Sequence, residues 1–167
     1  MSYSVTILES SFVGATNLHT AGSCTRTEME LPIRILIVDD FKDWRHQVHS
    51  LLRGRPEWQV IAEASDGLEA VQKAQDLMPE IILLDVGLPN MNGIEAARQI
   101  RRLSPNSKIV FLSQNCDVDI VRAALGTGAS GYVRKIDAGR ELLPAMDALL
   151  RGEQFVSSSD GVNFTDT

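Results

Sequence analysis

The sequence predicts an α/β domain with a parallel β-sheet between layers of helix, and two alternating patterns support this. Between residues 33 and 152, short and almost wholly apolar runs alternate with segments whose apolar residues recur at three- and four-residue steps. The apolar runs are typical of strands covered on both faces, and the stepped segments of helices with one buried side. Their regular alternation indicates successive βα units around a parallel sheet.

The first unit begins with residues 33–38, whose sequence IRILIV is almost continuously apolar. A helix follows, and the apolar positions that predict it are Phe41, Trp44, Val48, Leu51 and Leu52. We expect Trp44 to pack in the core and the helix to stop at Gly54 and Pro56.

The second and third units repeat this pattern. A strand is expected over residues 58–64 and a helix over 67–77, which Pro79 closes. The wholly apolar run 81–84 predicts the third strand. The third helix is expected to begin after Asn92-Gly93.

The fourth and fifth units complete a (βα)5 pattern of five strands and five helices. Strands are expected over residues 108–112 and 130–134, with a helix over 118–125 between them. A last helix carries Leu142, Met146, Leu149 and Leu150. Because proline lacks an N–H and its ring crowds the preceding turn, we expect that helix to begin close to Pro144 or to kink there.

The 167 residues allow one domain, to which we assign residues 33–152. Residues 1–32 are rich in Ser, Thr, Gly and Asn without a sustained period, and we interpret them as a disordered arm. Residues 153–167 are polar and Ser-rich, and we expect them to form a loose tail or a truncated linker.

Charge and composition disfavour several classes of protein. With 16 Lys plus Arg against 22 Asp plus Glu, the formal net charge is −6, which gives no long-range attraction to nucleic acid or anionic lipid. The apolar runs are far shorter than the roughly 20 residues that span a bilayer, and the N-terminus lacks a secretory pattern. We therefore expect a cytoplasmic protein with no nucleic-acid or membrane partner. Cys24 and Cys116 signal neither a disulfide framework nor a zinc site.

Polar residues follow four of the predicted strands: Asp39 and Asp40, Asp85, Ser113, and Lys135. In an open parallel sheet, binding sites form beyond the carboxyl ends of the strands, where the loops face one crevice. Taken singly, each residue has an ordinary role as a helix cap or a solvated charge. Together, three carboxylates repel one another and require a cation, and oxygen ligands favour a hard ion such as magnesium with a phosphate oxygen in its shell.

Four motifs in order resemble the receiver domain of bacterial two-component response regulators, above all the subfamily with helix-turn-helix outputs. The motifs are ILIVDD (35–40), LLDVGLPNMNG (83–93), FLS (111–113) and GASGYVRK (128–135). The second motif holds the spacing D-x-x-x-P-x-x-x-G at Asp85, Pro89 and Gly93. The resemblance covers about residues 33–152 and implies a flavodoxin-like three-layer sandwich with the parallel strand order 2-1-3-4-5.

By this resemblance, Asp85 is the phosphoacceptor, which takes a phosphoryl group from a sensor histidine kinase or a phosphotransfer protein. Mg²⁺ (or Mn²⁺) is held directly by Asp40, Asp85 and the backbone carbonyl of Gly87, with Asp39 acting through water. The metal offsets the charge between the anionic carboxylate and the anionic phosphoryl group.

The resemblance also implies how the phosphoryl group is sensed. Lys135 pairs with one phosphoryl oxygen and Ser113 donates to another, while Tyr132 matches an aromatic residue that swings inward as Ser113 moves. The result is a changed surface on the fourth helix, fifth strand and fifth helix, offered to a downstream protein or to a second copy in a homodimer. The chain would then be a signalling phosphoacceptor that assists its own phosphorylation and dephosphorylation, and not an enzyme.

The sequence departs from the family pattern at three positions near the site. Ile136 follows Lys135 where the family often has a cis-proline, Gly87 supplies no side chain, and Gln114 is bulkier than usual. Residues 148–157 look like the join to a DNA-binding domain, yet only ten residues follow them.

Two alternatives therefore stay open. In the first, the chain is a degenerate receiver that binds a protein without phosphorylation. In the second, it is the remnant of a DNA-binding transcriptional regulator. A phosphatase of the haloacid dehalogenase type is disfavoured because it needs a second acid where Gly87 stands. A flavin protein is disfavoured because Asp39 and Asp40 would repel the flavin phosphate.

Overall fold

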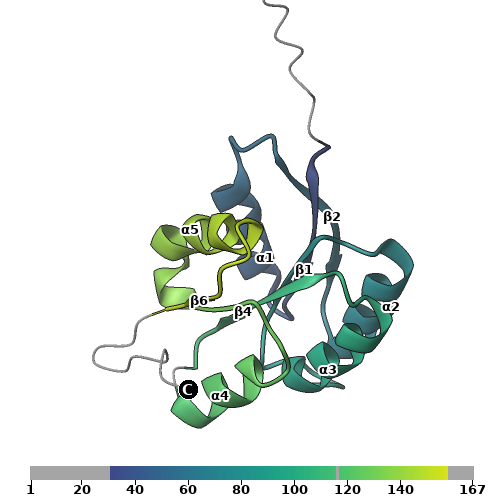
Figure 1. Cartoon of the computed structure of the whole chain (residues 1–167). Coiled ribbons are helices and arrows are strands. Elements are labelled where there is room, and N and C mark those ends of the chain that lie inside the picture. Colours follow the sequence, from purple (N-terminus) through teal and green to yellow (C-terminus); the bar gives the residue numbers. More distant parts are fainter. Residues whose placement is uncertain (1–30, 116, 158–167) are drawn as a thin grey trace, which may run out of the picture.

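The computed structural model describes residues 31–115 and 117–157, which form one sheet with helices on both faces (Figure 1). Both cysteines, residues 158–167 and the expected arm, apart from Leu31 and Pro32, lie outside the described residues. What was expected of those segments stays a prediction.

The sheet is parallel throughout, with the strand order β2-β1-β3-β4-β5-β6. Its strands are β1 (Ile33–Val38), β2 (Trp58–Ala64), β3 (Ile81–Leu84), β4 (Lys108–Ser113), β5 (Gly131–Arg134) and β6 (Phe155–Val156). The predicted class of fold and the order of the first five strands are confirmed. The sixth strand was not predicted.

Five α-helices connect or follow the strands of this sheet. They are α1 (Lys42–Leu52), α2 (Gly67–Leu77), α3 (Gly93–Leu103), α4 (Val118–Leu125) and α5 (Ala138–Leu150). A short 3₁₀-helix, Lys135–Asp137, makes the turn between β5 and α5. Ile136, which stands where the family often has a cis-proline, is therefore part of a 3₁₀ turn.

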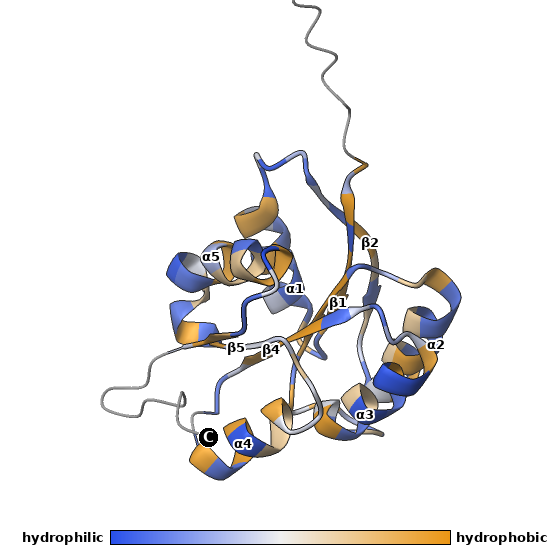
Figure 2. Cartoon of the chain, viewed as in Figure 1, coloured by the Kyte–Doolittle hydropathy of each residue, from blue (hydrophilic) through white to orange (hydrophobic). Residues whose placement is uncertain are grey.

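The core consists of two apolar layers, one on each face of the sheet. Alternate residues of β1 show this division, because Ile35 and Ile37 pack under α1 and α5 while Leu36 and Val38 pack under α2, α3 and α4. Figure 2 shows hydrophobic residues along the strands and a mixture of hydrophobic and hydrophilic residues on each helix. Burial of these side chains is the main favourable term in folding, and it holds the strand ends in fixed register.

Two outcomes were expected at Pro144, a helix start or a kink; the helix begins at Ala138, six residues before the proline, so the first is wrong and the kink stays a prediction. A proline inside a helix removes one backbone hydrogen bond and crowds the preceding turn. Here the helix is kept by its buried face, to which Leu142, Ala145 and Met146 contribute at 0% exposure. Tertiary packing outweighs the local preference of the proline.

β6 extends the sheet beyond β5 within the segment expected to be a loose tail. The Phe155 N–H donates to Ser130 O (3.1 Å) and the Ser157 N–H to Tyr132 O (2.8 Å). Phe155 also packs against the core layer under α1 and α5, and Val156 against the opposite layer. Two residues are too few to show a strand period, so the sequence pattern could not predict this element.

Within the described residues, none of the helices is both long enough and apolar enough to cross a membrane.

Candidate functional site

Three carboxylates meet at the carboxyl edge of the sheet, because β1 and β3 are neighbouring strands. Asp39 and Asp40 follow β1 and Asp85 follows β3, and the Asp85 N–H donates to Val38 O (2.9 Å), which continues the pairing of the strands. One carboxylate oxygen from each of the three lies within 4.8 Å of the others. Asp39 and Asp85 are buried and Asp40 is exposed.

Lys135 brings a positive charge to this group from the end of β5. Its Nζ lies 2.5 Å from Asp39 Oδ2 and 2.9 Å from Asp85 Oδ2. Burial disfavours the ammonium, but the contacts with Asp39 and Asp85 outweigh that effect and raise the pKa of Lys135 above its ordinary value. The ammonium therefore stays charged at neutral pH.

The positive charge of Lys135 does not compensate all three acids. Burial raises the pKa of the Asp39 carboxyl above its ordinary value, even though Lys135 and the Phe41 N–H (3.0 Å from Asp39 Oδ1) both favour the ionised form. One ammonium against three carboxylates leaves an excess of negative charge. The donor set is all oxygen, which is the set that magnesium and other hard divalent cations prefer. The residues therefore fit such a cation.

The spacing between Asp85 and Gly93 has a steric reason. Gly93 is the first residue of α3, and a Cβ built on it would lie 1.9 Å from the backbone oxygen of Asp85. The Gly93 N–H donates to Val86 O (2.9 Å), so the first turn of α3 contacts the backbone next to Asp85 directly. Only glycine permits this close approach. The glycine of the motif thus fixes the position of the Asp85 backbone relative to the start of α3.

Ser113 and Tyr132 are connected through the backbone of Asn115. Ser113, at the end of β4, is buried, and its Oγ accepts a hydrogen bond from the Asn115 N–H (3.1 Å). The Tyr132 hydroxyl donates to Asn115 O (2.8 Å), and its ring is buried beside Phe111 with the centroids 6.2 Å apart. Ser113 and Tyr132 are thus hydrogen-bonded to the same residue.

Most of the predicted residues line one open cavity of about 480 Å³. Its lining includes Asp40, Asp85, Gly87, Ser113, Lys135 and Trp44. A Cβ built on Gly87 would meet nothing within 4 Å, so the glycine leaves that side of the cavity open. Asp39 and Tyr132 are not among the lining residues: Asp39 pairs with Lys135, and Tyr132 is hydrogen-bonded to Asn115, which is hydrogen-bonded to Ser113.

The sequence pattern did not reveal the role of three further residues. Trp44 packs against the core layer under α1 and α5 as expected, but it is only partly buried and also lines the cavity, with the Lys135 Nζ 5.3 Å from its ring centroid. Asn115 acts through its backbone and left no signal in the sequence. Arg45 donates to the backbone oxygen of Asp39 (2.7 Å). Trp44 lies in the first turn of α1, only four residues after Asp40, and this short separation is a signal that could have placed it near the acids.

The response regulator receiver domain family matches residues 35–147. Among curated proteins, the chain is similar to the transcriptional regulatory protein LiaR of Bacillus subtilis, with 37% identity over 126 residues, which are 75% of this chain and 60% of LiaR. It is similar to the transcriptional regulatory protein DegU of Brevibacillus brevis, with 35% identity over 127 residues, which are 76% of this chain and 54% of DegU. The chain thus spans between 54% and 60% of the length of these two relatives.

Solved structures agree with the fold. A two-component response regulator of the LuxR family from Aurantimonas sp. is 35% identical, with a TM-score of 0.72 over 77% of this chain and 91% of that one. The response regulator domain of Thermotoga maritima CheB is 31% identical, with a TM-score of 0.64 over 74% of this chain and 96% of that one.

Proposed function

Because the chain belongs to the family of response regulator receiver domains, we propose that it accepts a phosphoryl group on Asp85 and passes the change to its α4, β5 and α5 surface. The single observation that carries this proposal is the geometry at Asp85. A buried carboxylate lies against the Lys135 ammonium (2.9 Å), within a group of three acids that opens into a cavity.

In the proposed reaction, an Asp85 carboxylate oxygen attacks the phosphorus of a phosphohistidine. A P–O bond forms while the P–N bond breaks, and its electron pair stays on the imidazole nitrogen. Lys135 pairs with one phosphoryl oxygen as a point charge, and the Ser113 hydroxyl donates to another. Both residues line the cavity beside Asp85, which supports these roles.

A divalent cation, Mg²⁺ or Mn²⁺, would be held by Asp40, Asp85 and the backbone carbonyl of Gly87, with Asp39 acting through water. When bound, it offsets the repulsion between the carboxylate and the incoming phosphoryl oxygens. The excess of negative charge over the Lys135 ammonium supports this set of ligands.

The switch would run from Ser113 through Asn115 to Tyr132. A phosphoryl oxygen that attracts the Ser113 hydroxyl pulls on the Asn115 N–H bonded to it, and the Tyr132 hydroxyl is bonded to the same residue. Two hydrogen bonds through one residue form a short route from the site to β5.

The partners we propose follow from this chemistry. The donor is a sensor histidine kinase or a phosphotransfer protein in the cytoplasm, and the output is a downstream protein or a second copy of this chain. We propose no direct contact of this chain with nucleic acid, because its net charge is −6.

The test is an intact-mass measurement after incubation with a small acyl phosphate, with and without magnesium. We expect one magnesium-dependent phosphoryl adduct on the parent protein, none on Asp85→Asn, and the parental adduct on Asp76→Asn, a matched change on the outer side of α2. The Asp85→Asn variant should stay folded, since it removes one of three repelling charges.

An adduct that persists in Asp85→Asn would place the phosphoacceptor elsewhere. If folded, metal-binding protein takes no phosphoryl group either from the acyl phosphate or from phosphorylated histidine kinases, the proposal is wrong. The degenerate binding module would then be the better description.

A further inference from the structure

Arg45 joins two neighbouring strands immediately behind the acidic site. It lies in the first turn of α1, and its side chain is 14% exposed. Its Nε donates to Glu63 Oε2 (2.6 Å) on β2, and its Nη1 donates to the backbone oxygen of Asp39 (2.7 Å) at the end of β1. One guanidinium therefore holds β2, α1 and the loop after β1 together.

The Asp39 oxygen belongs to the peptide group that joins Asp39 to Asp40. A hydrogen bond to it fixes the plane of that peptide, because the peptide group is rigid. The orientation of this plane sets the directions in which the two carboxylates leave the backbone. Arg45 thus acts on both acids through their shared peptide.

The charge of Arg45 is compensated where it lies. Glu63 accepts from the guanidinium at 2.6 Å, and His49 Nε2 lies 2.7 Å from the other Glu63 oxygen. A compensated guanidinium can hold the backbone without adding a net positive charge next to a site that has to attract a cation.

We propose that Arg45 is a positioning residue for divalent cation binding, which it serves by orienting the Asp39–Asp40 peptide. This inference rests on the proposed function, because it presumes that the acidic pair takes up a metal. Positioning requires the planar fork of arginine, which donates in two fixed directions, whereas the ammonium of lysine is a point charge.

The experiment measures Mn²⁺ affinity by the loss of the free-ion signal in electron paramagnetic resonance, beside the urea midpoint of each variant. We expect Arg45→Lys to weaken Mn²⁺ binding by about tenfold, as outer contacts of metal ligands commonly do. Arg45→Met should weaken it as well. If Arg45 acted on the metal only through its charge, the Arg45→Lys variant would bind Mn²⁺ with the affinity of the parent, and Arg45→Met would bind Mn²⁺ more tightly than the parent.

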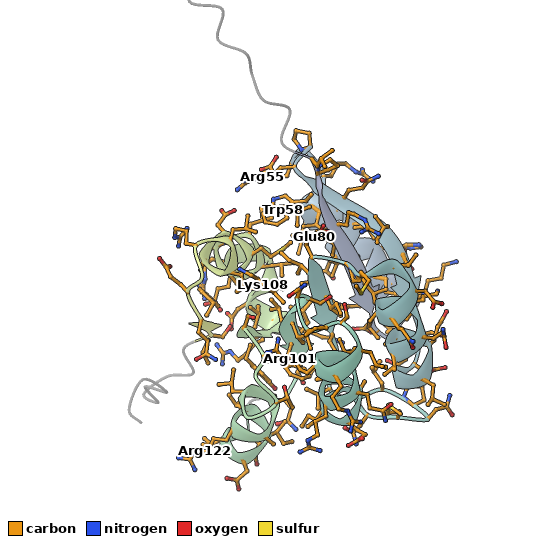
Figure 3. The ribbon with its side chains drawn as sticks, turned by 45° about the vertical axis from the view of Figure 1, so that its right-hand side comes forward. Arg55, Trp58, Glu80, Arg101, Lys108 and Arg122 are labelled. Carbon is orange, nitrogen blue, oxygen red and sulfur yellow. The ribbon has the colours of Figure 1, made fainter. Side chains whose placement is uncertain are left out.

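Two further variants keep the inference open to refutation. Arg55→Lys is the matched control, because Arg55 also pairs with a carboxylate (Glu57, 2.9 Å) but lies before β2, at the opposite end of the strands (Figure 3). Its Mn²⁺ affinity should equal that of the parent. Glu63→Gln keeps an oxygen for Arg45 but removes the compensating charge, so positioning predicts nearly parental affinity and a charge effect predicts a marked loss.

The outcomes separate this inference from the function on which it rests. If the parent protein binds no Mn²⁺ and forms no adduct, both fail. If the parent binds Mn²⁺ and Arg45→Lys binds it equally well with only a lower urea midpoint, Arg45 holds the fold and does not position the site. Should Arg45→Lys fail to fold, a marked loss of affinity in Glu63→Gln would overturn the inference and nearly parental affinity would support it.

Discussion

Arg45 connects two charged clusters, because it contacts both Glu63 and the backbone of Asp39, and these clusters are built in opposite ways. In the Glu63 cluster, defined by Arg45, His49 and Glu63, one carboxylate faces two basic side chains at 2.6 and 2.7 Å. In the acidic cluster, defined by Asp39, Asp40, Asp85 and Lys135, three carboxylates share one ammonium.

The pKa values reflect this difference. The hydrogen bond from Arg45 lowers the pKa of Glu63, with burial opposing it and His49 adding to it. Burial raises the pKa of Asp39, and Lys135 does not overcome that effect. At neutral pH the ionised Glu63 therefore stabilises the fold, whereas ionised Asp39 is disfavoured in the folded state, a cost that a further positive charge would offset. The proposed cation would offset the excess of negative charge in the acidic cluster, whereas the Glu63 cluster already holds its compensating charge.

The strongest way to test the comparison is to remove the ammonium from the acidic cluster. We expect Lys135→Met to lower the free energy of unfolding by about 3 kcal/mol without metal, because it leaves buried carboxylates without their partner. Magnesium should restore part of the loss. Urea unfolding with and without magnesium measures both effects, and Lys42→Met, at the exposed start of α1, is the control. If both variants are equally stable, the acidic cluster is not held together by Lys135.

Removing one acid from the acidic cluster should raise the free energy of unfolding, opposite to the effect of removing the ammonium. Asp40 lies within 4.8 Å of the other two carboxylates and is exposed, so Asp40→Asn removes repulsion without opening the core. We expect the free energy of unfolding to rise by about 1 kcal/mol in metal-free buffer. Magnesium should narrow the difference, since the parent gains more from the ion. An Asp40→Asn protein less stable than the parent without metal would contradict the view that the three acids are in excess.

The smallest expected effect is in the Glu63 cluster and depends on pH. The folded structure lowers the pKa of Glu63, so its ionised form stabilises the fold at pH values above 4.5, the ordinary pKa of this carboxyl. This stabilisation is lost as the pH falls through the lower pKa of the folded state. The Glu63 side chain is 34% exposed, so solvent screening limits the loss in Glu63→Gln to about 0.5 kcal/mol at pH 7.

The urea midpoints of Glu63→Gln and of the parent should therefore converge below pH 4.5, which is the ordinary pKa of this carboxyl. Glu57→Gln, in an exposed pair with Arg55, is the control and should change less. A difference that persists unchanged into acid would mean that Glu63 acts through packing and not through its charge.

The sequence predicted the parts of the fold that depend on period and on the ends of strands. The bounds of β1, β2, α2 and β3 follow from their apolar runs, their steps and the prolines that close them. The acids and Lys135 were found in the same way, because the residues after parallel strands must meet at one edge. Their roles in phosphorylation remain proposals.

What could not be predicted depends on contacts between distant segments. Trp44 has the spacing of a core residue, yet its ring also lies 5.3 Å from the ammonium of Lys135, which is 91 positions away. Arg45 and Asn115 act on or through backbone atoms, which carry no residue-specific signal. Pro144 misled the prediction of α5 because a single residue's preference was weighed without the buried face that outweighs it.

β6 decides where this domain can be cut. The apolar pattern ends at residue 152, but a protein truncated there would lose the hydrogen bonds that Phe155 and Ser157 donate to Ser130 and Tyr132, and would leave the edge of β5 uncovered. An exposed strand edge is a template for pairing with another chain. A protein ended at residue 152 should therefore self-associate more readily at high concentration than one ended at residue 157, whatever its state of phosphorylation.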